Sequence, residues 1–441
     1  MIHKVYLPSA TVSSAALGEA LRAVVSFDSD EDDHVLFTFS KDIEVSEANL
    51  QRMAIILEDG GYDALYSDYY FCEEGSQVRL LKLLDYTQGG RLREDFDFGK
   101  LLLVRKSSIV YNRHLEYAAF YYMRLGLNIC HLKEPLYSAG EQNKTDMFAY
   151  QNPRSRDAQK EFEVVCKDYL WKIGALMTGA PKTIDYDHAT GERGTFPVEA
   201  SVIIPVYNRV RTIKEAVVSA LSQQTEFPFN VIVIDNHSTD GTTEAIDEID
   251  DERLVHIIPE ETTLKIGGCW NKGVCSPQCG RFAVQLDSDD VYSGPHTLAK
   301  IVDAFHREKA GMVIGSYQLT DFEGRPISDH LIDHSEWTED NGRNNALRIN
   351  GLGAPRAYYT PLVREYPFPD VSYGEDYAVV IRIARSHRVG RIYENLYNCR
   401  RWEGNSDSNL SFEKTTENNS YKDSLRTMEL IARKKKNETA Y

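Results

Sequence analysis

"FNVIVIDNHSTDGTTEAIDEI" (residues 229–249) joins an almost unbroken apolar run to a polar turn and then to a helical pattern. An apolar run of this kind is typical of a strand that is buried on both faces of a parallel sheet. The Ser and Thr residues of the turn, at 238–242, are common helix caps. The preceding stretch "ASVIIPVYNRVRTIKEAVVSALSQQ" (200–224) has the same order of strand and helix. Two such units in succession predict an α/β fold, with a mostly parallel sheet and helices on both of its faces.

Polar side chains follow the strands of this predicted sheet. Asn208, Asp235 and Asp287 each come after an apolar run, and ligands of α/β sheets bind at the carboxyl ends of the strands. The stretch "QLDSDD" (285–290) places Asp287, Asp289 and Asp290 close together. Like charges at such spacing repel each other, and a bound cation would offset the repulsion. The alternative is that all three are turn and helix-cap residues.

Five stretches occur in the order and spacing of one enzyme family. They are "SVIIPVYNRVRTIKEAVVSALSQQ" (201–224), "VIVIDNHSTDGT" (231–242), "WNKG" (270–273), "VQLDSDD" (284–290) and "YGEDYAVVIRIA" (373–384). Together they resemble the family-two glycosyltransferases, which have the GT-A fold, over residues 200–405. Asn236 and His237 depart from the family pattern of an acidic residue followed by glycine. The tryptophan motif of processive members is reduced to "NCRRW" (398–402), without membrane helices, which argues against a polymer-extruding synthase.

The resemblance implies an inverting, metal-dependent glycosyltransferase that moves a sugar from a nucleotide diphosphate donor, expected to be a UDP-sugar. The expected acceptor is a hydroxyl group of a saccharide or of a lipid-linked molecule. Carried over to this sequence, Asp287 would approach the ribose and the cation, and Asp289 would bind the cation. The oxygen ligands suit Mn²⁺ or Mg²⁺. Asp376 takes the position of the general base, although one residue of register would exchange it with Glu375.

The other residues that the resemblance places at the donor are Asp235, Pro205, Tyr207, Asn208, Arg401 and Trp402. Asp235 matches the family residue that meets the edge of the uracil ring. The three residues after the first strand would form the other wall of the base pocket. Arg401 and Trp402 occupy a loop that often folds over the donor diphosphate, although Trp402 is equally consistent with a core ring.

The first 140 residues look like a shortened copy of the same fold. The stretches 35–75 and 283–324 both run strand, acidic turn, amphipathic helix, strand and hairpin, and 115–140 likewise parallels 375–400. Phe39 and Lys41 stand where Asp287 and Asp289 stand in the second copy. The first copy has only about thirty residues for its nucleotide-binding half, against about eighty in the second. We interpret it as a degenerate, non-catalytic repeat, with chance similarity of two α/β segments as the alternative.

The predicted organisation has four parts. Residues 1–140 form the degenerate GT-A-like domain, 141–196 a helical linker, 197–408 the catalytic domain, and 409–441 a charged C-terminal tail with a short helix. The linker helix is expected within 156–177, because apolar residues recur there at helical spacing. The seven cysteines include no CxxC pair and are expected to be reduced thiols.

Charge and hydropathy exclude several classes of partner. A net charge of −17 argues against binding to a nucleic-acid backbone. No apolar run approaches the roughly 18 residues that cross a bilayer. Pro8, Glu19 and Arg22 interrupt the apolar core that a signal peptide would need. These features predict a cytoplasmic protein, with at most peripheral attachment to a membrane through the basic run "RKKK" (433–436).

Two other functions are alternatives to sugar transfer. A non-catalytic module that binds saccharide or a partner enzyme would result if both copies were degenerate, but Asp287, Asp289 and Asp376 are all present. Nucleotidyl transfer to a sugar phosphate would require a Gly-rich, basic loop near the first strand. The stretch "VIIPVYNRVRT" (202–212) does not supply one.

Overall fold

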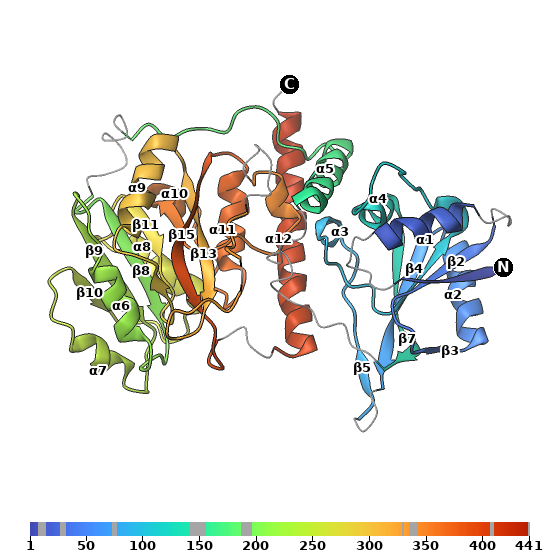
Figure 1. Cartoon of the computed structure of the whole chain (residues 1–441), viewed down its shortest axis with the longest axis horizontal. Helices are drawn as coiled ribbons and strands as arrows, with labels where there is room; N and C mark the ends of the chain where they lie inside the picture. Colours follow the sequence, from blue (N-terminus) through green and yellow to red (C-terminus); the bar gives the residue numbers. More distant parts are fainter. Residues whose placement is uncertain are drawn as a thin grey trace. The chain divides into compact units, whose positions relative to one another are not determined.

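The computed structural model describes residues 1–7, 15–26, 32–72, 77–140, 156–186, 196–328, 330–334, 342–405 and 410–439. The chain divides into two compact units (Figure 1). Unit 1 contains residues 1–176, 347–350 and 410–441, and unit 2 contains residues 177–346 and 351–409. The C-terminal tail therefore belongs to the same unit as the N-terminal half of the chain.

Unit 2 is built on an eight-stranded sheet with the order β10-β9-β8-β11-β14-β13-β15-β12. Its strands are β8 (Ala200–Val206), β9 (Phe229–Asp235), β10 (Leu254–Ile257), β11 (Phe282–Gln285), β12 (Val291–Tyr292), β13 (Met312–Thr320), β14 (Arg356–Tyr359) and β15 (Val389–Arg400). The neighbours β10, β9, β8 and β11 run parallel, whereas β14 is antiparallel to both β11 and β13. This mixed sheet, with four neighbouring parallel strands, agrees with the α/β sheet that the sequence predicted.

Helices connect the strands of unit 2 (Figure 1). They are α6 (Ile213–Leu221), α7 (Thr242–Asp247), α8 (Ile266–Cys275), α9 (Thr297–Glu308), α10 (Thr360–Glu365) and α11 (Glu375–Ala384). In α6, the buried residues Ile213, Ala216, Val217 and Ala220 recur at helical spacing, so that one face of the helix packs into the core. The strands β8 and β9 are buried along nearly their whole length, as predicted for a sheet with both faces covered.

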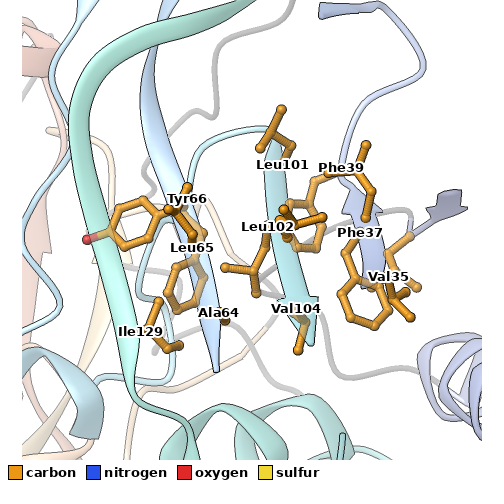
Figure 2. Close-up of a cluster of buried hydrophobic side chains, with 14 of the residues drawn as sticks. Val35, Phe37, Phe39, Ala64, Leu65, Tyr66, Leu101, Leu102, Val104 and Ile129 are labelled. Carbon is orange, nitrogen blue, oxygen red and sulfur yellow. The ribbon is translucent and has the colours of Figure 1, made fainter. Parts of the chain in front are cut away.

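Unit 1 is built on a seven-stranded sheet with the order β1-β2-β6-β4-β7-β3, in which β5 pairs with β4. Its strands are β1 (Ile2–Tyr6), β2 (His34–Thr38), β3 (Ile43–Val45), β4 (Ala64–Phe71), β5 (Arg79–Leu81), β6 (Leu101–Arg105) and β7 (Ile129–Ala139). Its helices are α1 (Ala15–Val25), α2 (Glu47–Asp59), α3 (Gln88–Leu92), α4 (Ala119–Gly126), α5 (Arg156–Lys172) and α12 (Phe412–Glu438). Phe37, Phe39, Leu65 and Leu102 are among the apolar side chains that form its core (Figure 2).

Six strands of unit 1 repeat six strands of unit 2 in order and direction. In unit 1, β1 and β2 are parallel, β6 is antiparallel to β2 and β4, β4 and β7 are parallel, and β3 is antiparallel to β7. In unit 2, the path β8-β11-β14-β13-β15-β12 has the same sequence of directions. The pairs β4–β7 and β13–β15 both contain a register shift. In the described part of unit 1, the sheet has no strand beyond β1 that would correspond to β9 or β10.

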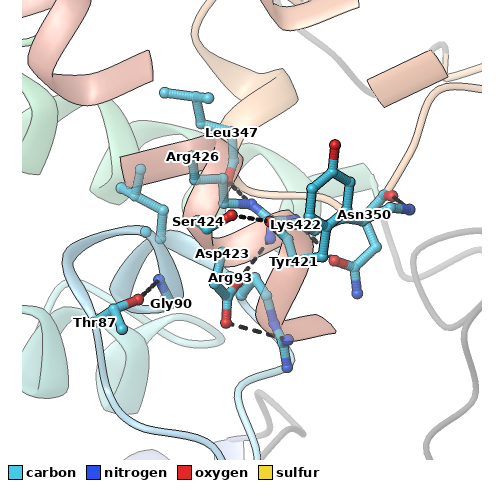
Figure 3. Close-up of polar contacts among 12 residues, drawn as sticks. Thr87, Gly90, Arg93, Leu347, Asn350, Tyr421, Lys422, Asp423, Ser424 and Arg426 are labelled. Carbon is cyan, nitrogen blue, oxygen red and sulfur yellow. Dashed lines mark hydrogen bonds and ion pairs between the residues drawn. The ribbon is translucent and has the colours of Figure 1, made fainter. Parts of the chain in front are cut away.

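The C-terminal helix α12 is longer than the short helix that the sequence predicted. It spans 27 residues, and much of its buried face is polar or charged. The fully buried Arg426 donates to the carbonyl oxygens of Leu347 (3.0 Å) and Ile349 (2.9 Å) and to Asp423 (2.8 Å) (Figure 3). A Cβ atom at Gly89 in α3 would overlap the carbonyl oxygen of Asp423, so the helices approach closely only because this residue is glycine. A polar buried face lacks the wide apolar stripe that marks a long helix in a sequence.

Two further properties concern the chain as a whole. Among the described residues, no helix has both the length and the apolar character to cross a bilayer. The seven cysteines are all free thiols, as predicted.

Candidate functional site

Asp287 lies directly after β11 and is held by neighbouring polar groups. The side-chain Nε2 of Gln285 donates to both carboxylate oxygens of Asp287, at 2.9 and 3.1 Å. The backbone N–H of Asp287 donates to the hydroxyl of Tyr397, at 3.0 Å. Gln285 is the last residue of β11 and is buried. The end of the strand therefore fixes the direction of the Asp287 carboxylate.

Asp289 is contacted by the segment that follows β15. Its Oδ2 accepts hydrogen bonds from the indole N–H of Trp402 (3.3 Å) and from Nδ2 of Asn405 (3.2 Å). The Nε of Arg209 lies 3.9 Å from the same oxygen. Trp402, a predicted donor-site residue, thus contacts Asp289, the predicted metal ligand, although the two residues are 113 positions apart in the sequence.

The turn at the end of β11 brings three carboxylates close together. Burial raises the pKa of Asp287 above its ordinary value. Burial, together with the charges of Asp289 and Asp287, raises the pKa of Asp290 well above its ordinary value. Asp290 accepts the backbone N–H of Arg400 at 2.7 Å, so it has a structural role. Among the residues described, no three His, Cys, Asp or Glu side chains are arranged to hold an ion by themselves.

Asp235 is the last residue of β9 and is fully buried. Its Oδ1 accepts the backbone N–H of Ser238 (2.9 Å), and its Oδ2 accepts the hydroxyl of Thr243 (2.5 Å). Burial alone would raise the pKa of Asp235, but the nearby His256 and these hydrogen bonds lower it below its ordinary value. The Asp235 carboxylate therefore holds the turn after β9. A uracil ring that bound to this carboxylate would compete with its hydrogen bonds to Ser238 and Thr243.

The predicted wall of the base pocket, Pro205, Tyr207 and Asn208, lies at the end of β8. Tyr207 is 56% exposed, so its ring is not part of the core. Asn208 has a left-handed backbone (φ 52°), and its Oδ1 accepts the N–H of Thr239 at 2.8 Å. Its own N–H donates to the hydroxyl of Ser238 at 2.9 Å. Asn208 therefore ties the end of β8 to the turn that Asp235 holds.

Asn236, one of the departures from the family pattern, follows Asp235 in this turn. Its Nδ2 donates to the carbonyl oxygen of Leu264 at 2.9 Å, which fixes the orientation of the amide. Among the described residues, its buried Oδ1 has no hydrogen-bond partner.

Asp376 lies in the first turn of α11, and Arg356 at the start of β14 contacts it. The Nη2 of Arg356 lies 3.1 Å from Oδ2 of Asp376. The backbone N–H of Arg356 donates to Oε1 of Gln285 (3.1 Å), whose Nε2 holds Asp287. Arg356 and Gln285 therefore connect Asp376, the predicted general base, to Asp287, the carboxylate predicted to bind the ribose and the metal. Glu375, which a shift of one residue would put in the place of Asp376, is buried, whereas Asp376 is half-buried.

The two arginines at the end of β15 have different surroundings. Arg400 is fully buried, donates through Nε to the carbonyl oxygen of Asp289 (2.6 Å), and forms an ion pair with Glu215. Its guanidinium therefore supports the acidic turn after β11. Arg401 is half-buried, and its backbone N–H donates to the carbonyl oxygen of Thr320 at 2.9 Å.

Arg209, Gln285 and Arg356 contact the predicted site residues but were not singled out from the sequence. The available signal for Gln285 was a polar residue inside the apolar run "FAVQL" (282–286). The signal for Arg356 was a charge at the start of the aromatic run "RAYY" (356–359). Arg209 gave no signal, because an arginine in a polar turn is ordinary surface chemistry.

Comparison with known proteins matches this part of the chain to one family. The family model for Glycosyl transferase family 2 matches residues 201–364. An uncharacterized glycosyltransferase of Nostoc sp. is 28% identical over 144 residues, which are 32% of this chain and 44% of that protein. The chain spans less than half the length of several such curated relatives.

Two further matches cover a larger share of the matched protein than the Nostoc match does. The UDP-Glc:alpha-D-GlcNAc-diphosphoundecaprenol beta-1,3-glucosyltransferase WfgD of Escherichia coli is 24% identical over 196 residues, covering 44% of this chain and 72% of that protein. The crystal structure of S. aureus TarS 1–349 in complex with UDP-GlcNAc matches with a TM-score of 0.42 at 22% identity, covering 52% of this chain and 66% of that chain. The family match includes Asp235, Asp287, Asp289 and Arg356. Residues 201–364 of this chain are therefore similar to glycosyl transferase family 2, by a match that covers less than half of the chain.

Proposed function

We propose that unit 2 is the catalytic domain of an inverting, metal-dependent glycosyltransferase that uses a nucleotide diphosphate sugar. The observation that carries this proposal is the connected set of polar residues across β11 and β14. Asp287 and Asp289 follow β11, and Gln285 and Arg356 link Asp287 to Asp376 at the start of α11. This arrangement offers two carboxylates for a cation at the donor diphosphate and a separate, partly exposed carboxylate for a general base.

In the proposed reaction, an acceptor hydroxyl attacks the anomeric carbon of the donor sugar. The new carbon–oxygen bond forms as the bond to the diphosphate oxygen breaks, and the configuration at that carbon inverts. Asp376 takes the hydroxyl proton, which makes it the general base. Its place in the first turn of α11 favours the ionised form, because the amino end of a helix stabilises negative charge.

Asp289 and Asp287 would hold Mn²⁺ or Mg²⁺. Both offer carboxylate oxygens, and the mutual repulsion of three neighbouring carboxylates favours a cation at this place. A cation at this position supplies Lewis-acid stabilisation of the charge that develops on the leaving group.

We further propose a UDP-sugar as the donor and a saccharide or lipid-linked hydroxyl as the acceptor. The name of the Escherichia coli relative states a UDP-Glc donor and a diphosphoundecaprenol-linked acceptor for that protein. We also propose that unit 1 is a degenerate, non-catalytic copy of the unit 2 fold. Its strand path repeats that of unit 2, and Phe39 is buried in its apolar core.

Binding of UDP with and without metal tests the donor site. UDP should raise the melting temperature of the full chain more when Mn²⁺ is present, because a ligand of the native state adds stability. Asp289→Ala should remove this metal-dependent increment. Asp303→Ala changes an exposed aspartate in α9 and serves as the matched control. An unchanged increment in Asp289→Ala would contradict the assignment of the metal site.

Release of UDP from a panel of UDP-sugars tests the activity itself. We expect one donor to be hydrolysed in the presence of Mn²⁺, and Asp289→Ala to abolish this turnover. Metal-dependent UDP binding without turnover of any donor, with and without saccharide acceptors, would favour the alternative of a non-catalytic binding module.

A further inference from the structure

Arg356 occupies a central position between the two halves of the proposed site. Its Nη2 contacts Asp376 at 3.1 Å, and its Nη1 donates to the carbonyl oxygen of Leu352 at 2.6 Å. Its backbone N–H donates to Gln285, which in turn holds both carboxylate oxygens of Asp287. The planar guanidinium is thus fixed at two points, and one prong is directed at Asp376.

A buried arginine at this place is costly for the fold. Only 16% of the Arg356 side chain is exposed, and removing a charge from water carries a desolvation penalty of several kcal/mol. Burial alone would lower the pKa of Arg356, but the charges of Asp376 and Asp287 raise it above its ordinary value. The positive charge of Arg356 is therefore stabilised mainly by Asp376, and Asp287 adds to this stabilisation.

Unit 1 shows that this strand arrangement does not need the polar residues. In unit 1, β2 and β6 pair as β11 and β14 pair in unit 2, and Phe37 lies opposite Leu102. The corresponding opposed positions in unit 2 are Gln285 and Arg356, one step beyond the pair Val284–Ala357. Phe39 stands two positions after Phe37, as Asp287 stands two after Gln285. Where the carboxylate is absent, its two polar partners are therefore absent as well.

We propose that Arg356 is a positioning residue that orients the Asp376 carboxylate toward the acceptor hydroxyl. This inference rests on the proposed function of unit 2. Gln285 is its counterpart on the donor side, so that β14 and β11 together set the distance between the base and the donor carboxylate. Displacing a catalytic group by about 1 Å costs roughly 100-fold in rate, which is why the base needs a second contact besides its own helix.

The test compares Arg356→Gln and Arg356→Lys in the full chain. The assay follows UDP release from the UDP-sugar that the wild type hydrolyses, with Mn²⁺. Arg356→Gln should lower kcat roughly 100-fold and leave the KM of the donor nearly unchanged. Arg356→Lys keeps the positive charge and should recover part of kcat. Arg364→Gln is the matched control, because Arg364 caps carbonyl oxygens of Val274 and Ser276 in the same unit without touching Asp376.

A double-mutant cycle of melting temperatures with Arg356→Gln and Asp376→Asn gives a readout that does not depend on turnover. Coupled residues should give shifts that are not additive. Provided that the wild type turns over a donor, three results would overturn the positioning role. They are a near-normal kcat in Arg356→Gln, an equal loss of kcat in Arg364→Gln, and additive shifts of the melting temperature in the cycle. Absence of turnover in the wild type with every donor would instead overturn the proposed function, and the inference with it.

Discussion

Asp376 is the single residue on which the proposed chemistry depends most. Asp376→Asn keeps the size of the side chain and removes its basicity. We expect turnover to fall roughly 10²–10⁴-fold, the usual contribution of acid–base catalysis, while UDP affinity changes little. UDP release and titration calorimetry with UDP and Mn²⁺ measure the two quantities. A variant with near-normal turnover, or with UDP binding lost as completely as activity, would rule out the assignment.

His256 is a second residue with a measurable contribution, in this case to stability. Its Nε2 lies 3.7 Å from Oδ2 of Asp235, and its Nδ1 lies 2.9 Å from Oδ1 of Asp247. The Asp235 carboxylate raises the pKa of His256 above its ordinary value of 6.5, burial opposes the rise, and Asp247 adds to it. A raised pKa means that the charged form binds the native state better, so the stabilisation is complete below pH 6.5 and is lost as the pH rises through the folded value.

The corresponding prediction concerns His256→Gln. The difference in urea midpoint between the wild type and this variant should be largest near pH 5.5 and should shrink by pH 8.5. Unfolding curves across this range measure it. Parallel pH profiles of the two proteins would show that the contacts of His256 with Asp235 and Asp247 do not couple protonation to folding.

At the scale of a secondary-structure element, α12 is stabilised by buried charge pairs rather than by an apolar stripe. Arg426 contacts Asp423 and two carbonyl oxygens of the segment 347–350, all within unit 1. Arg426→Met should destabilise unit 1 by about 3–5 kcal/mol, because Asp423 keeps only the more distant Arg93 (3.5 Å) and the carbonyl oxygens of Leu347 and Ile349 lose their donor. Lys435→Met changes an exposed residue of the same helix and is the control. Equal urea midpoints for the two variants would contradict this account of α12.

At the scale of the whole molecule, the two units share a strand path but differ in the residues at the end of the corresponding strand. Phe39 is 5% exposed in the core of unit 1, whereas Asp287 in unit 2 has polar partners. We expect titration calorimetry with Mn²⁺ to give one UDP per chain. The double variant Asp287→Asn, Asp289→Asn should bind none. Residual metal-dependent binding of one UDP in the double variant would place a nucleotide site in unit 1, contrary to its proposed role.

The sequence alone determined the parts of this protein that depend on local patterns. The buried strands β8, β9 and β11 and the helix α6 follow from the spacing of apolar residues between neighbours in the chain. The acidic turn after β11, and Phe39 in the place that corresponds to Asp287, could be predicted from the sequence because they too are local patterns.

Tertiary structure alone decided which distant groups meet these residues. The contact of Trp402 with Asp289 and the link from Arg356 to Asp376 join segments whose approach depends on the pairing of β15 and β14 within the sheet. The buried face of α12 was also hidden from the sequence, because a polar face reads as solvent-exposed until its partners are known. The physical reason is the same in each case: apolar periodicity is a property of one segment, whereas a buried charge is stable only through the specific partner that folding brings to it.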